Sequence, residues 1–158
     1  MLQFCYQHLN PDLMVPVEWS IYQVQGRWQQ QLGDLGDQHG QFNRPRGLTL
    51  TSDESSLLVA DSGNHRVQVL RASDGTWLRT LSGPAGTLEE PHGVAVVPST
   101  GEVLVTDIRR NQVVRFKSID SDTVIDTLGA PGDGPSQFNN PCDLIILDGP
   151  YCPLVRSL

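Results

Sequence analysis

The sequence predicts an all-β fold made of repeated four-stranded units, and three observations support this. The 158 residues include 15 glycines and 11 prolines, and only 18% are charged. Short apolar segments alternate with polar turns along most of the chain. A block of similar residues also recurs after Pro45, Pro91 and Pro141. Helical bundles and coiled coils use few glycines and prolines, so the composition argues against both.

The recurring block has a regular spacing. Pro45, Pro91 and Pro141 lie 46 and 50 residues apart, and each opens an apolar segment. Asp61 follows Pro45 by 16 residues, and Asp107 follows Pro91 by the same distance. The first two repeats therefore align without a gap, which indicates a true internal repeat.

The segment before the proline is repeated as well. Residues 40–45 read GQFNRP and residues 136–141 read SQFNNP. Gly33 and Gly129 each stand twelve residues before the proline of their repeat. This segment is expected to connect one repeat to the next.

Each full repeat reads as four short strands. The first is almost continuously apolar, which is typical of a strand buried on both faces, and the third alternates between apolar and polar residues. The strands are expected at 48–50, 57–60, 66–70 and 77–81, and again at 94–97, 103–106, 112–116 and 123–128. Four antiparallel strands in a repeat of this length predict one blade of a β-propeller.

The blades can be counted along the chain. Full blades are expected at 42–83 and 88–129, half blades at 18–33 and 138–158, and a leader without the repeat at 1–17. The total is about three blade equivalents, whereas propellers close with about 4–8 blades. The expected fold is an incomplete propeller. It is either part of a larger ring, with exposed strand edges, or half of a homodimer that completes a six-blade ring.

The first full repeat resembles the NHL repeat, which is named after an Asn-His-Leu triplet. Residues 42–47 read FNRPRG and residues 59–69 read VADSGNHRVQV, where Asn64, His65 and Arg66 occupy the place of the triplet. The second repeat keeps the proline, glycine and aspartate of the pattern at Pro91, Gly93 and Asp107. The third begins at Pro141 and then has Asp143 in place of the glycine and Ser157 in place of the aspartate.

The resemblance covers residues 18–158 and implies a propeller of NHL-type blades. Such propellers occur in tripartite-motif ubiquitin ligases and in the peptidyl-hydroxyglycine amidating lyase. In the ligases the propeller serves as a binding module. The resemblance is therefore specific for the fold and leaves several functions open.

The repeated positions are expected to serve the fold. An aspartate after a strand can accept hydrogen bonds from turn N–H groups, and Asn64 tolerates left-handed backbone geometry. A metal-binding or catalytic carboxylate is the alternative for the aspartates. The expected structural residues are Pro45, Gly47, Asp61, Asn64, His65, Arg66, Pro91, Gly93, Asp107 and Pro141. Four aromatic residues, Trp28, Phe42, Trp77 and Phe138, are expected to pack between blades.

His92 and Cys142 are weak candidates for a metal site. Both stand one residue after the proline that opens an inner strand, where Arg46 stands in the first repeat. The amidating lyase that the chain resembles holds zinc with histidines around the propeller axis. One histidine and one cysteine fall short of a zinc site, so we expect no metal and no cofactor. Cys5, Cys142 and Cys152 are widely spaced, which is typical of reduced thiols in a cytoplasmic protein.

The charge balance argues against nucleic acid as a partner. The net charge is -7, and Lys117 is the one lysine in the chain. Arg109, Arg110 and Arg115 form the candidate basic surface, so an RNA-binding NHL domain stays an alternative. The longest aliphatic runs have four residues, which excludes an apolar membrane-spanning helix, and no signal peptide is visible.

The predicted function is a non-catalytic module that binds a protein partner on one propeller face, in a scaffold linked to ubiquitin ligation. No RING or B-box cysteines are present, so ligation itself would belong to another polypeptide or to further sequence. A metal-dependent propeller lyase is the alternative from the enzyme class. No phosphate-binding loop or nucleophile motif supports another enzyme.

Overall fold

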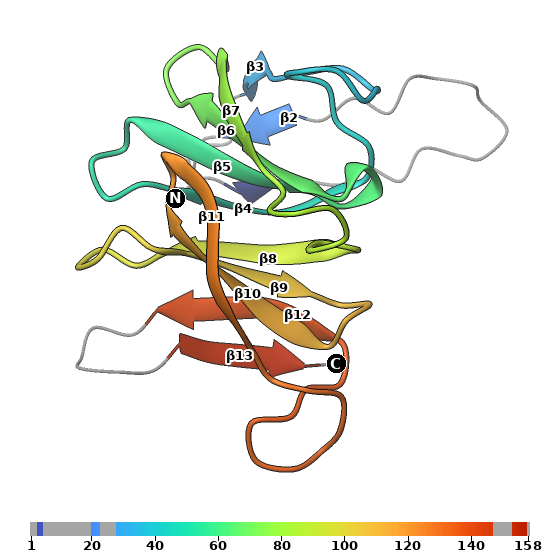
Figure 1. Ribbon diagram of the computed structural model, residues 1–158. Helices are drawn as coiled ribbons and strands as arrows, with labels where there is room; N and C mark the ends of the chain where they lie inside the picture. Colours follow the sequence, from blue (N-terminus) through green and yellow to red (C-terminus); the bar gives the residue numbers. More distant parts are fainter. Residues whose placement is uncertain (1–2, 5–19, 23–27, 147–152, 158) are drawn as a thin grey trace, which may run out of the picture.

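The computed structural model describes residues 3–4, 20–22, 28–146 and 153–157. Within these residues every regular element is a β-strand except η1, a single 3₁₀ turn (Ser62–Asn64). The strands form small antiparallel sheets that follow one another as layers in the order of the sequence (Figure 1). The prediction of an all-β, incomplete propeller is confirmed. This part of the chain holds no helix long and apolar enough to cross a membrane.

The first four-stranded sheet is formed in chain order. Its strands are β4 (Pro45–Leu50), β5 (Ser56–Asp61), β6 (Arg66–Arg71) and β7 (Trp77–Leu81). Every residue of β5 is buried, because this strand lies inside the sheet and has apolar layers on both faces. The sequence led us to expect burial on both faces at the first strand of the blade, but only Pro45 of β4 is buried, so in this sheet the second strand is the one buried on two sides.

The second four-stranded sheet repeats this order. Its strands are β8 (Pro91–Val96), β9 (Val103–Asp107), β10 (Gln112–Ser118) and β11 (Ser121–Leu128). The pairing of Pro91 with Asp107 matches that of Pro45 with Asp61, and a register shift follows each proline. The spacing of 16 residues between proline and aspartate therefore reflects one hairpin geometry used twice.

Two smaller sheets flank the complete ones. The first consists of β1 (Gln3–Phe4), β2 (Ser20–Tyr22) and β3 (Trp28–Gln31), and the second of β12 (Pro141–Ile146) and β13 (Pro153–Ser157). The sequence assigned no strand to the expected leader, yet β1 lies there and pairs with β2. Apart from β1, the leader at 1–17 lies outside the described residues, as do Cys5, Cys152 and the side chain of Trp28.

The sheets are held together by apolar layers. Leu58 and Ala60 of β5 pack with Val103 and Val105 of β9 in the layer between the two complete sheets. Leu57 points the other way and packs with Phe42. Side chains of one strand thus alternate between two layers, as a strand between two neighbouring blades requires.

A third layer joins the second complete sheet to β12 and β13. Leu104 of β9 and Ala95 of β8 pack there with Leu144 of β12, and Phe138 borders the cluster. Phe42, Leu88 and Phe138 each stand three residues before the proline of their repeat. Each of them packs in the layer before its own sheet, as expected for the two phenylalanines.

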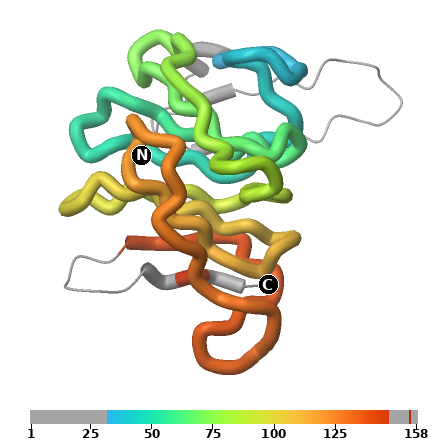
Figure 2. Tube along the Cα trace, in the orientation of Figure 1, coloured from blue at the N-terminus to red at the C-terminus, as the bar shows by residue number. Residues whose placement is uncertain are grey.

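The inner strands of successive sheets lie side by side. In Figure 2, which traces the backbone in the orientation of Figure 1, β8 lies between β4 and β12. A Cβ atom added at Gly47 would lie 2.4 Å from the backbone oxygen of His92, and one added at Gly93 would lie 3.0 Å from Cα of Asp143. These two glycines therefore permit the close approach of neighbouring inner strands.

Candidate protein-interaction face

One end of the sheets gathers most of the positions that the sequence singled out. Pro45 lies opposite Asp61 and Pro91 opposite Asp107, so the prolines and the aspartates share this end. We call it the prolyl face. Its charged and candidate residues are Arg44, Arg46, Glu89, Glu90, His92, Arg109, Arg110, Cys142 and Asp143.

Asp61 is fully buried behind this face and accepts four hydrogen bonds. Its Oδ1 atom accepts from the backbone N–H of Asn43 over 2.7 Å. Its Oδ2 atom accepts from Arg66 Nε at 2.8 Å, Asn64 Nδ2 at 2.9 Å and Gln68 Nε2 at 3.2 Å. The carboxylate ties the turn after β5 to the segment before β4, so none of its oxygens is left for a ligand from solvent.

Asp107 also ties a turn to the segment before its sheet, and its hydrogen-bond donors are backbone N–H groups. Its carboxylate accepts from the N–H groups of Glu89 at 2.7 Å, Glu90 at 3.1 Å and Arg110 at 3.2 Å. The second repeat lacks the Asn-His-Arg sequence, and main-chain groups take the place of its side-chain donors. Both aspartates therefore lie in turn hydrogen bonds of the kind that the repeat pattern suggested.

The left-handed residue of the turn is His65, not Asn64 as the sequence suggested. His65 has φ of 56°, and Asn111, the aligned residue of the second repeat, has φ of 51°. Asn64 keeps a negative φ, and its side chain donates to Asp61 and to the backbone oxygen of Gly36. The prediction was one residue off because asparagine suits both a left-handed turn and side-chain bonding to a turn.

The turns of the face also join neighbouring sheets. The Ser62 hydroxyl donates to the backbone oxygen of Pro91, and the His65 imidazole contacts the backbone oxygen of Glu89. One blade further on, Oδ1 of Asn111 accepts from the N–H of Asn140 over 2.8 Å. The prolyl face is thus a set of turns held rigidly from blade to blade.

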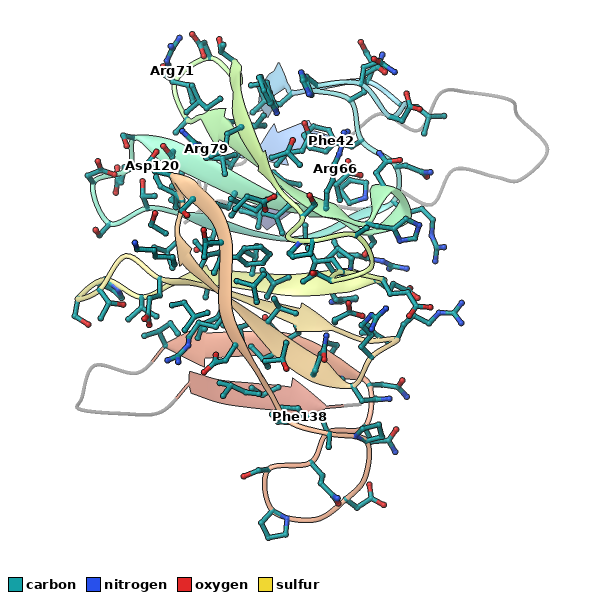
Figure 3. All side chains as sticks on the ribbon, in the orientation of Figure 1. Phe42, Arg66, Arg71, Arg79, Asp120 and Phe138 are labelled. Atoms are coloured by element: carbon teal, nitrogen blue, oxygen red, sulfur yellow. The ribbon has the colours of Figure 1, made fainter. Side chains whose placement is uncertain are left out.

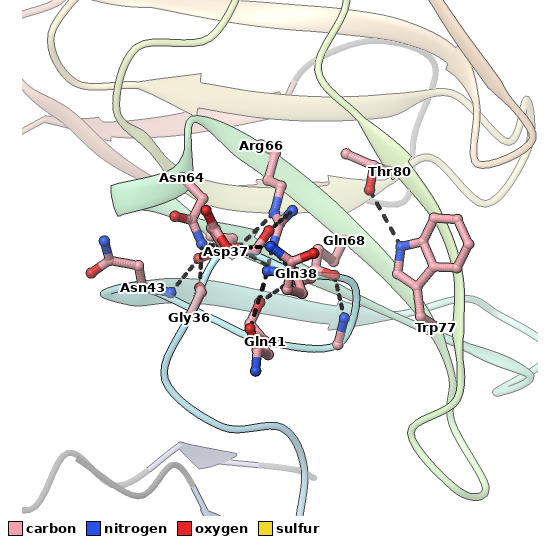
Figure 4. Close-up of polar contacts among 12 residues, drawn as sticks. Gly36, Asp37, Gln38, Gln41, Asn43, Asn64, Arg66, Gln68, Trp77 and Thr80 are labelled. Carbon is pink, nitrogen blue, oxygen red and sulfur yellow. Dashed lines mark hydrogen bonds and ion pairs between the residues drawn. The ribbon is translucent and has the colours of Figure 1, made fainter. Parts of the chain in front are cut away.

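A clamp of side chains holds the segment that leads into β4 (Figure 4). The Arg66 guanidinium donates to the carbonyl oxygens of Asp37, Gln38 and Gln41 over 2.7 to 2.9 Å. Gln68 Nε2 donates to the Gln41 oxygen over 2.6 Å. The sequence singled out Arg66 but missed Gln68, whose signal is a polar residue between Val67 and Val69 in a buried strand.

The expected basic surface is paired with carboxylates throughout. Nε of Arg109 lies 3.0 Å from Glu90, and Nε of Arg110 lies 3.7 Å from Glu89. Arg115 lies further along β10, and Nε and Nη2 of its guanidinium lie 2.9 and 2.6 Å from the two oxygens of Asp126. That hydrogen-bonded pair raises the pKa of Arg115. Arg115 therefore lies apart from Arg109 and Arg110, and each of the three arginines has a carboxylate beside it.

His92 and Cys142 meet, but through the main chain of the cysteine. Nδ1 of His92 contacts the backbone oxygen of Cys142. Burial lowers the pKa of His92 below its ordinary value, the Cys142 carbonyl opposes this, and the charge of Arg46 adds to the lowering. In the described ranges no three His, Cys, Asp or Glu side chains come close enough together to hold a metal ion.

Both complete sheets contain a match to a known repeat family. The NHL repeat family matches residues 42–70 and 88–116. Each match starts at the apolar residue that stands three positions before the proline, Phe42 or Leu88, and that packs in the layer before its own sheet. Each match ends inside the third strand of a complete sheet. No curated protein matches the chain in sequence.

Solved structures with the same architecture include two much longer chains. Hydrazine synthase of Kuenenia stuttgartiensis matches with a TM-score of 0.52 and 17% identity, over 71% of this chain and 29% of that one. A chain of the nidogen/laminin complex matches with a TM-score of 0.51 and 24% identity, over 70% of this chain and 38% of that one. The chain thus spans well under half of either, and at these identities the likeness shows a shared propeller fold.

Proposed function

Because this chain belongs to the NHL-repeat family of β-propeller proteins, we propose that it is a non-catalytic module that binds a protein partner through the prolyl face. The proposal rests on the arrangement of charge at that face. Two exposed guanidinium groups, those of Arg44 and Arg109, share the single carboxylate of Glu90 at 3.9 and 3.0 Å. This is the observation that carries the proposal.

Because Arg44 and Arg109 share the one carboxylate of Glu90, a net positive charge remains at this place on a chain that is acidic overall. The side chains of Arg44 and Arg109 are 64% and 67% exposed, so their pairing with Glu90 contributes little to stability. The pairs can therefore be exchanged for a carboxylate of a partner at small cost. Arginine is enriched at protein interfaces because its planar fork binds carboxylates through two hydrogen bonds.

The platform below these arginines is rigid. Asp61 and Asp107 hold the turns, and contacts of Ser62 and His65 with the next sheet fix the turns relative to one another. A surface that is already ordered loses little conformational entropy when a partner binds. Rigid turns that present exposed arginines suit an acidic segment of a folded protein.

Charge reversal on the face tests the proposal. Proteins captured by the wild-type chain are compared with those captured by the Arg44→Glu/Arg109→Glu variant, and each candidate is then purified and titrated directly. We expect the double variant to lose roughly tenfold or more in affinity for the partner. Lys117→Glu is the matched control, because Lys117 is exposed near the opposite end of β10. A partner that binds the face variant and the wild type equally would contradict the proposal.

A finer form of the proposal gives the module a role in ubiquitin ligation. Its support is the family resemblance, since tripartite-motif ligases carry propellers of this type. The purified partner is assayed for ubiquitin transfer with and without the chain. Transfer that depends on the chain and is lost in the Arg44→Glu/Arg109→Glu variant is the expected result, and transfer unaffected by the chain would exclude this role.

A further inference from the structure

Four exposed arginines gather where the two complete sheets meet at the prolyl face. Arg44 and Arg46 flank the first residue of β4, and Arg109 and Arg110 lie in the turn between β9 and β10. We call these four residues the arginine cluster. Each of the two sheets that supply it is complete, with all four strands described.

The cluster has fewer carboxylate partners than arginines. Glu90 lies beside both Arg44 and Arg109, and Glu89 lies 3.7 Å from Arg110. Three other surface arginines each have a carboxylate of their own, as Figure 3 shows for Arg79 and Asp120. These pairs are Arg71 with Asp74, Arg79 with Asp120, and Arg115 with Asp126, at 3.0, 3.5 and 2.6 Å. The cluster therefore holds an excess of positive charge on a chain whose net charge is -7.

Two further carboxylates lie near the cluster, but neither of them pairs with it. Asp107 is buried below the turn and accepts hydrogen bonds from backbone N–H groups. Asp143 lies on β12, one sheet further along, and its Oδ1 atom accepts from the N–H of Leu144 over 2.9 Å. Among the described residues no ion pair joins either carboxylate to an arginine of the cluster.

Glu90 holds two guanidinium groups of the cluster at one place. Its Oε1 atom lies 3.9 Å from Nη2 of Arg44, and its Oε2 atom lies 3.0 Å from Nε of Arg109. The Glu90 side chain is 22% exposed, so both arginine side chains, at 64% and 67%, are far more open to solvent than the carboxylate between them. Neither guanidinium donates to any other described residue. Most of their N–H donors are therefore open to an anion from solvent.

A phosphoryl group suits this place better than a carboxylate does. Phosphorylated serine, threonine and tyrosine carry about −1.5 to −2 charges at pH 7 and three strong acceptor oxygens. Each planar guanidinium can donate two parallel hydrogen bonds to such a group, so two of them can hold it together. A carboxylate brings a single charge, which Glu90 already supplies. A phosphoryl group concentrates at one point the charge that the shared carboxylate leaves unbalanced.

The small extent of the cluster disfavours nucleic acid as its ligand. A nucleic-acid backbone is bound by a basic stripe or patch that neutralises several phosphates. Here the exposed arginines are confined to the turns of two sheets, and Lys117 lies near the other end of β10. A single phosphate matches a basic site of this size.

We propose that the arginine cluster binds a phosphorylated serine, threonine or tyrosine of the partner protein, with the phosphoryl group between Arg44 and Arg109. The phosphoryl oxygens accept hydrogen bonds from both guanidinium groups, and Arg46 and Arg110 add positive charge nearby. The inference rests on the proposed function and deepens it, because phosphorylation of the partner then controls its binding to the prolyl face.

Peptide mixtures with a fixed central residue provide the probe. Random residues flank a centre of phosphoserine, phosphothreonine, phosphotyrosine, serine or two successive glutamates, and the wild-type chain is titrated against each immobilised mixture. We expect at least one phosphorylated mixture to bind roughly tenfold more tightly, or better, than both the serine and the glutamate mixtures.

A matched pair of variants checks the location. Arg44→Glu/Arg109→Glu should lose the binding, and Arg71→Glu/Lys117→Glu should keep it, although both variants change the net charge equally. Arg71 ends β6, and Figure 3 shows it at the other end of this strand from Arg66, which lies at the prolyl face. Circular dichroism shows whether both variants are folded.

A measurement on the wild-type chain needs no substitution in the protein that binds. NMR observes the Nε–H groups of arginine side chains directly. A phosphopeptide selected from the tightest mixture should shift the signals of Arg44 and Arg109 and leave that of Arg71 in place. Shifts confined to arginines outside the cluster would overturn the inference.

The outcomes separate this inference from the proposed function. No binding by any phosphorylated mixture, or binding no tighter than that of the glutamate mixture, would overturn the inference alone, because titration of captured partners judges the proposed function. A partner that binds the wild type and Arg44→Glu/Arg109→Glu equally would overturn both. An oligouridylate that binds the chain more tightly than every phosphorylated mixture would make nucleic acid the ligand and would also overturn both.

Discussion

Arg66 and Asp61 form a nearly solvent-free ion pair, with Nε of the guanidinium 2.8 Å from Oδ2 of the carboxylate. The Asp61 side chain is fully buried and that of Arg66 is 12% exposed. The pair links the two functions of the turn, because Asp61 anchors the hairpin and Arg66 holds the segment of residues 33–44 that leads into β4. The aspartate that recurs in the first two repeats is therefore, at Asp61, the centre of a buried polar network.

We expect Asp61→Ala to destabilise the chain by about 3–5 kcal/mol, because it leaves Nε of Arg66 and the Asn43 N–H without their acceptor. Urea unfolding followed by circular dichroism measures the change. Arg71→Ala is the control, since the Arg71–Asp74 pair is about half exposed on both sides and its loss should cost less than about 1 kcal/mol. Equal losses for the two variants would refute the buried network.

We expect Gly47→Ala to destabilise the chain by roughly 1–3 kcal/mol, because the new methyl group would meet the backbone oxygen of His92 at 2.4 Å. The inner strands β4 and β8 would have to move apart. Thermal unfolding measures the effect. A companion variant, Gly93→Ala, should behave alike, since its Cβ would lie 3.0 Å from Cα of Asp143. Unchanged midpoints for both would show that the inner strands are not in close contact.

The lowered pKa of His92 predicts a loss of stability in weak acid. Burial and Arg46 disfavour the imidazolium, while Asp143 and Glu90 oppose this. The unfolded chain then binds a proton more readily than the folded chain. The contribution of His92 is therefore full above its ordinary pKa of 6.5 and falls as the pH drops from there toward the lowered folded value.

Unfolding free energies of the wild type and of His92→Gln, measured from about pH 7.5 down to about pH 5, test this prediction. The wild type should lose more stability over this range than the variant, in which no group titrates at this position. A steeper loss in His92→Gln would contradict the assigned direction.

Ile145 presents an apolar side chain to solvent on β12. It is 58% exposed, whereas Ala95, the aligned residue of β8, is 8% exposed and packs in the layer with Leu144. We expect Ile145→Ser to change the unfolding free energy by less than about 0.5 kcal/mol and to raise the concentration at which the chain aggregates. Light scattering and urea unfolding provide the two readings. A loss typical of a buried isoleucine, about 2 kcal/mol or more, would show that this face is covered.

Much of the fold could be predicted from spacing alone. The equal distances from Pro45 to Asp61 and from Pro91 to Asp107 reflect one hairpin register, which any repeat of this blade must keep. The strands β5 and β9 were predicted from short apolar runs, but the burial on both faces expected at the first strand of each blade is complete at these second strands instead. β1 could not be recognised, since two residues are too few for an alternating pattern.

The charge network of the prolyl face could not be predicted. Arg109 and Arg110 formed a basic pair in the sequence, but the chain brings Glu90 and Glu89 beside them from about twenty residues earlier. Gln68 was missed for a similar reason, because its partners Gly40 and Gln41 precede it by 28 and 27 residues. Local pattern shows which residues repeat, whereas pairing across a sheet depends on the assembled blades.

One loop geometry occurs at residues 33–44, where Arg66 and Gln68 of β6 hold it, and again at residues 129–140, where no side chain of the described residues donates to the carbonyls of Asp133, Gly134 and Gln137. Hydrogen exchange at the Phe42 and Phe138 amides tests it most directly, since both N–H groups donate over 2.8 Å to an equivalent carbonyl. The account predicts that Phe42 exchanges at least roughly tenfold more slowly, because Arg66 and Gln68 must release the loop before it opens. Equal exchange rates at the two amides would contradict it.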